Sequence, residues 1–484
     1  MGIVGTLSEA TSASEDALRL LISVLSGYPL AVVHRTFFYD KPKQVQHAFF
    51  VAVGLFLWYF NCGVAVIHPL IAIVAAFAIT NFIPGTDASV YAAHSVFLGH
   101  LLFGYWFHET DTYDITWTTP FCIMTLRFIG LVMDVYDGKQ KPEELKADQK
   151  LTAISDKPGL LEIAAFGLFF QGTLVGPQFT LAKFRSFGTL VGPQFTLAKF
   201  RSFVNGDWLE NGKPPKSAFL PSIGRFLAGC TYMVLHQWGQ FWIPDTFFNS
   251  DAFFNLSFFW RWTWTTLWFR LTMYKYCAMW LMTEGASILS GLGHNGKDKE
   301  GNDLWDGVRD LHIIKWETGH DYNSVVESFN CGTNTFAKNH IHRRLRWLNN
   351  KLASHVVTLS YLAIWHGYHL GYFLLFGVEL GCAQNQLYAL IKRTPGWTET
   401  ISKPIARPFI WIFGKLTISY SMGFAFLMFG LIKTKYWIGP VKSLYFIGFF
   451  IYFVFWPILH IVLLRVLPRH KKPETGGAEA KKEL

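Results

Sequence analysis

The sequence predicts an all-α polytopic membrane protein with about 10–11 transmembrane helices. Hydrophobic residues make up 51% of the 484 residues and charged residues only 16%, whereas soluble globular proteins carry about 25% charged side chains. The apolar residues also gather into runs, many of them close to the roughly 20 residues that cross a bilayer core. This composition excludes secreted disulfide scaffolds, coiled coils and nucleic-acid binders with a soluble core.

The apolar runs follow one another through most of the chain and are separated by charged or Pro/Gly-rich residues. In order, they lie near residues 17–33, 48–60, 63–83, 89–107, 117–136, 159–181, 218–243, 252–290, 353–391, 408–432 and 437–466. The first two are short and fit re-entrant or interfacial segments, whereas 252–290 is long enough for two helices. The run 353–391 has room for either two short passes or one long tilted helix.

Residues 1–466 are predicted to form a single membrane domain, with a polar lead over residues 1–15. The two sizeable polar stretches inside it, 137–158 and 291–351, hold too few apolar residues to build cores of their own. Residues 467–484 are rich in Lys, Glu and Gly and predict a disordered tail.

The tail and the charge balance together predict a location. The chain ends Lys481-Lys482-Glu483-Leu484, a di-lysine pattern that resembles the cytosolic retrieval signal of endoplasmic-reticulum membrane proteins. The net charge of +10 is expected of cytoplasmic loops facing anionic lipid, so it does not indicate nucleic acid. We expect a multi-pass protein of the endoplasmic-reticulum membrane with a cytosolic tail.

One internal repeat is exact. Residues 172–187 read GTLVGPQFTLAKFRSF, and residues 188–203 repeat this string letter for letter. Repeat architectures need several diverged copies, so a single perfect copy predicts no solenoid. We expect one copy to be accommodated as an extra loop or turn of helix.

The run 353–391 places histidines in an apolar setting, which is costly and by default marks function. At about 100° per residue, His355, Thr358, His366 and His369 fall on one side of a helix. A buried histidine can also make a single structural hydrogen bond, and His369 fits that alternative better than His366. The glycines and Trp365 around His366 favour a site, with Trp365 and His369 as candidate substrate-binding neighbours.

A basic stretch precedes this run and contains no acidic residue. Its charged candidates are Lys338, Arg343, Arg344 and Arg346. One interpretation is a solvated loop on the cytoplasmic side; the other is that these groups bind the phosphates of an anionic substrate. The sequence shows no metal-ligand cluster, phosphate loop or dinucleotide fingerprint.

Together these residues carry a resemblance. Asn330, followed after the basic stretch by Trp365-His366-Gly367, resembles the paired Asn and His of the membrane-bound O-acyltransferase family. Four further strings resemble its lysophospholipid acyltransferase branch: Thr283-Glu284-Gly285, GLGHNG at 291–296, YDITW at 113–117 and VGPQF at 175–179. The resemblance covers most of residues 15–468. Because of the exact repeat, both Gln178 and Gln194 match the family glutamine and both are candidate substrate-binding residues, while Phe336 stands where the family often has Trp.

The resemblance implies helices around a central catalytic tunnel in which His366 and Asn330 are catalytic. It implies acyl-CoA as donor and a lysophospholipid, chiefly lysophosphatidylcholine, as acceptor, with a preference for polyunsaturated chains, so membrane lipids are partners. Acyl-CoA is then a co-substrate, and no cofactor or metal is expected. A homodimer is left open.

The residues allow a direct mechanism. His366 can remove the proton of the attacking hydroxyl, because a buried imidazole is neutral at cytosolic pH. Asn330 can orient that hydroxyl or polarise the thioester without adding charge to a dry cavity. We find no Ser or Cys placed as a nucleophile, so transfer without an acyl-enzyme is expected.

Two alternatives remain open at this stage. A relative acting on a protein or sterol hydroxyl would use the same residues but needs a wide lumenal funnel. A lipid transporter would use the polar side of the helix as a path, but transporters commonly show inverted repeats, and the sequence shows no such symmetry.

Overall fold

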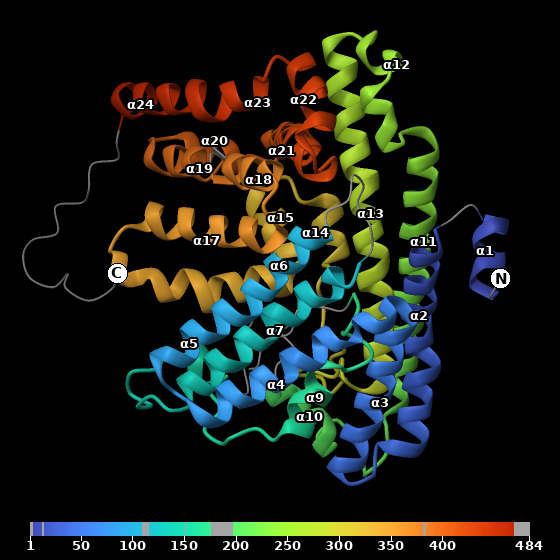
Figure 1. Cartoon of the computed structure of the whole chain (residues 1–484). Helices are drawn as coiled ribbons and strands as arrows, with labels where there is room; N and C mark the ends of the chain where they lie inside the picture. Colours follow the sequence, from blue (N-terminus) through green and yellow to red (C-terminus); the bar gives the residue numbers. More distant parts are fainter. Residues whose placement is uncertain are drawn as a thin grey trace, which may run out of the picture.

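A computed structural model describes residues 3–11, 14–108, 116–150, 152–175, 197–380 and 384–468. Within these ranges the chain is helical, with three isolated β-bridges and no strand (Figure 1). The all-α polytopic membrane fold predicted from composition is confirmed. The di-lysine end of the tail lies outside the described residues.

The helices follow the predicted runs closely. The first ten α-helices are α1 (Ile3–Thr11), α2 (Glu15–Val33), α3 (Lys43–Cys62), α4 (Ile67–Phe82), α5 (Asp87–Ala93), α6 (Gly99–Phe107), α7 (Thr118–Asp137), α8 (Ala147–Lys150), α9 (Leu160–Gly167) and α10 (Leu197–Asn205). The next seven are α11 (Phe219–Trp242), α12 (Asp251–Phe254), α13 (Phe258–Ser290), α14 (Ile313–Thr318), α15 (Tyr322–Ser328), α16 (Cys331–Phe336) and α17 (Lys351–His366). The last seven are α18 (Leu370–Leu380), α19 (Gln384–Arg393), α20 (Trp397–Ser402), α21 (Ala406–Gly430), α22 (Thr434–Ser443), α23 (Ile447–Phe449) and α24 (Trp456–Val466).

Short 3₁₀ and π segments join or extend these helices. They are η1 (His34–Phe38), η2 (Gly63–Val66), η3 (His94–Leu98), η4 (Lys216–Ala218), η5 (Asp245–Asn249), η6 (Ala337–Ile341), η7 (His342–Leu348) and η8 (Phe450–Phe455). Of these, η1, η3, η6 and η8 are π-helical.

Six segments among the described residues are long and apolar enough to cross a membrane. They are Glu15–Phe38, Lys43–Phe82, Thr118–Asp137, Lys216–Asn249, Ala406–Gly430 and Ile447–Val466. Other predicted runs are helical too but are built from shorter pieces. The run 89–107, for example, consists of α5, η3 and α6.

Helix α13 is the central element, and it corrects one prediction. We expected two helices over 252–290, but a single helix of 33 residues begins at Phe258 and ends at Ser290. It is followed by Gly291, which has the left-handed φ of 101° typical of a helix C-terminus. No proline interrupts it. At 1.5 Å per residue it is about 50 Å long, and Figure 1 shows it beside α11 and α2, both of which it contacts along with α21.

Two hydrophobic clusters flank the middle of the chain. The N-terminal cluster gathers buried residues of α3, α4, α6, α7 and α9, such as Phe50 and Phe128. The C-terminal cluster gathers those of α13, α21 and α22, such as Trp268 and Phe424. Phe376 of α18 packs against both, so α18 lies where the two clusters meet.

Of the two alternatives for the run 353–391, the structure agrees with separate shorter helices and not with one long tilted helix. The run breaks directly after His366, because Gly367 has φ 133° and ψ −171° and cannot continue α17. Helix α18 then begins at Leu370 and packs against α17. The predicted common helical side of His366 and His369 is therefore wrong, since His369 lies beyond the end of the helix.

The exact repeat is only partly visible. Residues 176–196, which include most of the first copy, lie outside the described residues, and so do Gln178 and Gln194. Of the second copy, Leu197 onward forms α10. The expectation of an extra loop or turn stays a prediction.

Candidate functional site

A helical hairpin carries both residues of the predicted catalytic pair. Its first arm runs through α16, η6 and η7, and its second arm is α17. The turn between them is made by Asn349, with a left-handed φ of 48°, and by Asn350, whose side chain accepts a hydrogen bond from the Ala353 amide at 3.1 Å. Asn330 directly precedes the first arm and His366 ends the second.

Three contacts fix the register of the two arms. The Ser354 hydroxyl donates to the Leu345 carbonyl at 3.2 Å, the His342 and His355 rings lie 4.5 Å apart, and the Thr358 hydroxyl lies 3.5 Å from His342 Nδ1. In two antiparallel arms, the residue numbers of facing positions have a nearly constant sum. In these three contacts that sum is 697–700, so the contacts agree on one register.

This register has a consequence for the open end of the hairpin. Continued along α17, it places His366 level with residues 331–334, directly after Asn330. Extended from these contacts near the turn, the register puts the imidazole and the carboxamide at the same, open end of the hairpin, although 36 positions separate them in the sequence.

His366 is surrounded by aromatic rings from three elements. Its ring centroid lies 5.7 Å from Tyr372 and 5.8 Å from Phe376 of α18, and 5.0 Å from Phe429 of α21. Its own neighbour Trp365, at 4.5 Å, completes the group. These rings give the half-buried imidazole a largely aromatic environment.

Trp365 fixes the end of α17 and with it the imidazole. The side chain is 4% exposed, and its Nε1 donates to the Cys122 carbonyl of α7 at 2.9 Å. The Trp365 carbonyl in turn accepts from the Tyr105 hydroxyl at 3.3 Å. Trp365 thus anchors the helix end to α6 and α7, which is a positioning role beside its predicted substrate contact.

Within the described part of the chain, neither the His366 imidazole nor the Asn330 carboxamide makes a side-chain hydrogen bond. No group there hydrogen-bonds the ring nitrogens of His366, and the Asn330 side chain does not cap the helix that it precedes. Both residues are half-buried. The two side chains are therefore available to a ligand.

Asn330 has an uncommon backbone conformation. Its φ of 52° and ψ of 44° lie in the left-handed region, which Asn tolerates better than most residues. Asn334 holds the turn from the other side, because its Nδ2 donates to the carbonyls of Phe329 at 3.0 Å and Val326 at 2.8 Å.

The thiol that follows Asn330 in the chain, that of Cys331, is a poor nucleophile. Burial, and then the neighbouring Asp310 carboxylate, raise the pKa of the Cys331 thiol to about 12. At neutral pH it is protonated and unreactive. The expectation that no covalent acyl-enzyme forms stays a prediction.

His369 lies one ring away from His366. Its ring centroid is 5.8 Å from Tyr372, which also contacts His366, and 5.0 Å from Tyr368. It is half-buried in the turn between α17 and α18. Its predicted contact with substrate stays a prediction.

The basic residues of the first arm differ in their surroundings. Arg344 makes a bidentate ion pair with Asp137, at 2.7 Å to Oδ1 and 2.5 Å to Oδ2, and Asp137 is 1% exposed. The pair ties the arm to the end of α7. Lys338 and Arg346 are exposed, and Arg343 is half-buried.

Lys146 belongs to the same group, and sequence reasoning missed it. Partial burial, followed by the charges of Arg346, Arg343 and Arg344, lowers the pKa of the Lys146 ammonium. The four cations therefore lie within electrostatic reach of one another. Lys146 lies in the polar stretch 137–158, whereas the arginines lie in the polar stretch 291–351. No local sequence pattern indicated that these two stretches lie close together.

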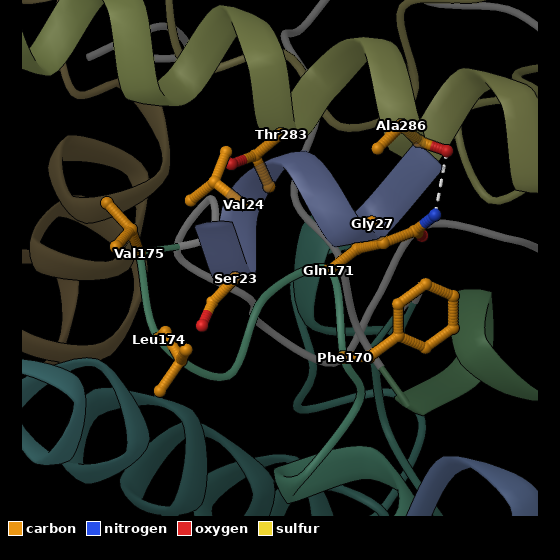
Figure 2. A pocket seen from close by; sticks show the side chains of 9 residues that line it. All are labelled: Ser23, Val24, Gly27, Phe170, Gln171, Leu174, Val175, Thr283 and Ala286. Carbon is orange, nitrogen blue, oxygen red and sulfur yellow. Dashed lines mark hydrogen bonds between the residues drawn. The ribbon is translucent and has the colours of Figure 1, made fainter. Parts of the chain in front are cut away.

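A small pocket lies elsewhere, against α13. Figure 2 shows it between α2, the segment that follows α9, and α13, with Gln171 reaching across. Gln171 Nε2 donates to the Ala286 carbonyl at 2.7 Å, and its Oε1 accepts from Ser290 at 2.9 Å. Neither His366 nor Asn330 lines this pocket. The hydrogen bonds of Gln171 therefore hold the start of the repeated segment in place and do not position His366 or Asn330.

Comparison with known proteins agrees with the resemblance. A model of the MBOAT, membrane-bound O-acyltransferase family, matches residues 102–423, which include the whole hairpin. The chain is 84% identical to Lysophospholipid acyltransferase 5 of Caenorhabditis elegans over 100% of both chains. It is 34% identical to Lysophospholipid acyltransferase 5 of Bos taurus, over 96% of this chain and 93% of the relative. It is 26% identical to Lysophospholipid acyltransferase of Schizosaccharomyces pombe, over 89% and 84%.

Proposed function

The chain belongs to the membrane-bound O-acyltransferase family, and we propose that it transfers an acyl chain from acyl-CoA to the free hydroxyl of a lysophospholipid. It is a multi-pass membrane enzyme of the acyltransferase class. Several relatives are named as lysophospholipid acyltransferases, which supports the acceptor class. The observation that carries the proposal is the register of the hairpin, which brings two unused polar side chains to one end.

The chemistry follows from the two groups. The neutral His366 imidazole takes the proton of the acceptor hydroxyl as its oxygen attacks the thioester carbonyl. Asn330 donates an N–H to the carbonyl oxygen, where negative charge develops. The C–S bond then breaks, an ester forms, and His366 returns the proton to the departing CoA thiolate.

The aromatic rings around His366 support transfer of the acyl chain to the hydroxyl rather than to water. Phe429, Tyr372 and Phe376 surround the imidazole with aromatic side chains, and such an environment disfavours hydrolysis of the thioester relative to transfer. The raised thiol pKa of Cys331 supports direct transfer.

The cationic group gives the donor an entrance. CoA carries several negative charges, and Lys146, Arg343 and Arg346 offer matching charge near the turn end of the hairpin. We assign the phosphates of CoA to this end and the thioester to the opposite end, at His366. Lys338 belongs to the same arm and adds to its positive field, whereas the charge of Arg344 is balanced by Asp137.

The finer assignments rest on the family resemblance and the tail. We propose lysophosphatidylcholine as the main acceptor, polyunsaturated chains as preferred donors, and the endoplasmic reticulum as the location. The first two are tested by product formation from a panel of acyl-CoAs and lysophospholipids, and the third by imaging a variant with Lys481 and Lys482 replaced by Ala.

The central experiment uses the purified full chain in detergent with acyl-CoA and lysophosphatidylcholine. We expect consumption of both and formation of phosphatidylcholine, with His366→Ala lowering kcat by about 10²–10⁴-fold and Asn330→Ala by about 10²–10³-fold. The matched control is Val357→Ala, on the same helix but exposed, which should keep its activity. Unchanged lipid would favour transport over catalysis, and full activity of His366→Ala would reject the assigned base.

A further inference from the structure

Two asparagines precede the two arms of the hairpin, and they behave differently. Asn350 is an ordinary N-cap: its backbone is extended, with φ −131° and ψ 109°, and its side chain accepts from Ala353 N–H. That is the usual use of an N-cap side chain. Asn330 occupies the equivalent position before α16, yet it is left-handed and its side chain makes no capping bond.

The capping bond of α16 comes instead from Asp310. Its carboxylate Oδ1 accepts from the Gly332 amide at 2.7 Å, and its carbonyl accepts from the Cys331 amide at 3.3 Å. Asp310 is 3% exposed. A buried carboxylate at a helix N-terminus is well placed for the helix dipole as well as for these amides.

The segment that carries Asp310 is itself held in place. Leu311 forms a β-bridge with Phe329, and the His312 amide donates to the Ser328 carbonyl at 2.9 Å. On the other side, Arg309 Nε donates to Glu284 of α13 at 3.0 Å. Asp310 therefore connects the central helix to the turn that presents Asn330.

We propose that Asp310 is a positioning residue for catalysis, because it caps α16 in place of Asn330 and so keeps the Asn330 carboxamide free for substrate. This inference rests on the proposed function. Without the Asp310 carboxylate, the Gly332 amide lacks its acceptor, and Asn330 can relax to the extended conformation of an ordinary N-cap. Its side chain would then bind this amide and leave the thioester.

The test compares Asp310 with a matched capping residue in the same chain. Asp321 caps the preceding helix α15, where its Oδ1 accepts from the Ser324 amide at 2.6 Å. Both Asp310→Ala and Asp321→Ala remove one helix cap. We expect Asp310→Ala to lower kcat by about 10- to 100-fold, since small misplacements of a reacting group cost about that much. The KM for acyl-CoA should change less than about twofold, and Asp321→Ala should keep the parent kcat.

A conservative variant and a double mutant separate positioning from folding. Asp310→Asn keeps an oxygen acceptor for Gly332 N–H and should retain most of the kcat, whereas Asp310→Ser, whose hydroxyl is one bond too short, should lose it. In an Asn330→Ala background, Asp310→Ala should lower kcat by less than about twofold further, because the group that it positions is already absent. If Asp310→Ala does not fold, the kcat values of Asp310→Asn and Asp310→Ser are compared instead to test the positioning role.

Three results would overturn the inference: an unchanged kcat for Asp310→Ala or Asp310→Ser, equal losses for Asp310→Asn and Asp310→Ala, or full additivity with Asn330→Ala. Failure of the underlying function looks different. In that case Asn330→Ala itself would keep its activity, whatever Asp310 does.

Discussion

Replacing Asp137 should destabilise the chain by about 2–3 kcal/mol, because the pair that it makes with Arg344 is nearly buried. Removing one partner of a buried ion pair costs about 3–5 kcal/mol. The Arg344 side chain keeps 25% of its surface exposed while that of Asp137 keeps 1%, so water partly solvates the orphaned guanidinium and reduces the cost. The expected loss for Asp137→Ala is therefore below the fully buried range.

The measurement is the free energy of unfolding in detergent with increasing denaturant, followed by tryptophan fluorescence. The control is Arg346→Ala, an exposed residue of the same arm, which should change stability by less than about 0.5 kcal/mol. In the Arg344→Ala background, Asp137→Ala should cost less than about 1 kcal/mol, because the pair is already broken. Additive losses in the double mutant would refute the coupling.

The same variants ask whether Arg344 also binds CoA. If the guanidinium serves only Asp137, the double variant Arg344→Ala/Asp137→Ala, which keeps the net charge, should keep the parent KM for acyl-CoA. A higher KM in the double variant would show that Arg344 also contacts phosphate.

Further predictions concern three other positions. Gly367→Ala should lower stability by about 1–2 kcal/mol and reduce kcat, because its φ of 133° is unfavourable for Ala and the new Cβ would lie 3.1 Å from the Tyr372 ring; thermal unfolding and turnover measure both. Lys146→Ala should raise the KM for acyl-CoA about fivefold at low salt, with a smaller effect at high salt, since it removes one exposed charge. Burial raises the pKa of Asp303, but hydrogen bonds led by that from Ser217 outweigh burial and lower the pKa below its ordinary value. Because the folded pKa is depressed, Asp303 stabilises its loop above about pH 4 and loses this contribution as the pH falls further, which hydrogen exchange of the loop would detect.

Each of these three has a distinct contrary outcome. Wild-type stability of Gly367→Ala would mean that the turn tolerates another conformation. An unchanged KM for Lys146→Ala, matched by the exposed control Lys213→Ala, would remove Lys146 from the donor entrance. If hydrogen exchange of the loop in Asp303→Asn still accelerates at low pH as in the parent, the loss of loop stability in acid would be due to another group.

The sequence predicted the helical membrane fold well because the bilayer imposes a local rule. A spanning segment must satisfy its own backbone and bury its side chains in lipid, so length and hydropathy report it directly. The prediction failed where a boundary depended on packing: α13 is one helix rather than two. For the run 353–391 the sequence left two alternatives open, and the packing decided that α17 ends at His366.

His366 was readable from the sequence because an ionisable group in an apolar run is costly and needs a reason. The resemblance added Asn330 and the donor and acceptor classes. Lys146 and Asp310 were not readable, because each acts on a residue far along the chain through a contact that no local pattern encodes.

By itself, the sequence determined that this chain is a helical membrane protein with an imidazole in an apolar setting, because both properties follow from composition within one segment. The tertiary structure decided the register of the two arms of the hairpin, which arginine forms an ion pair with Asp137, and which residue caps α16. These depend on pairing between distant segments, and that pairing is set by the packing of the whole helical body.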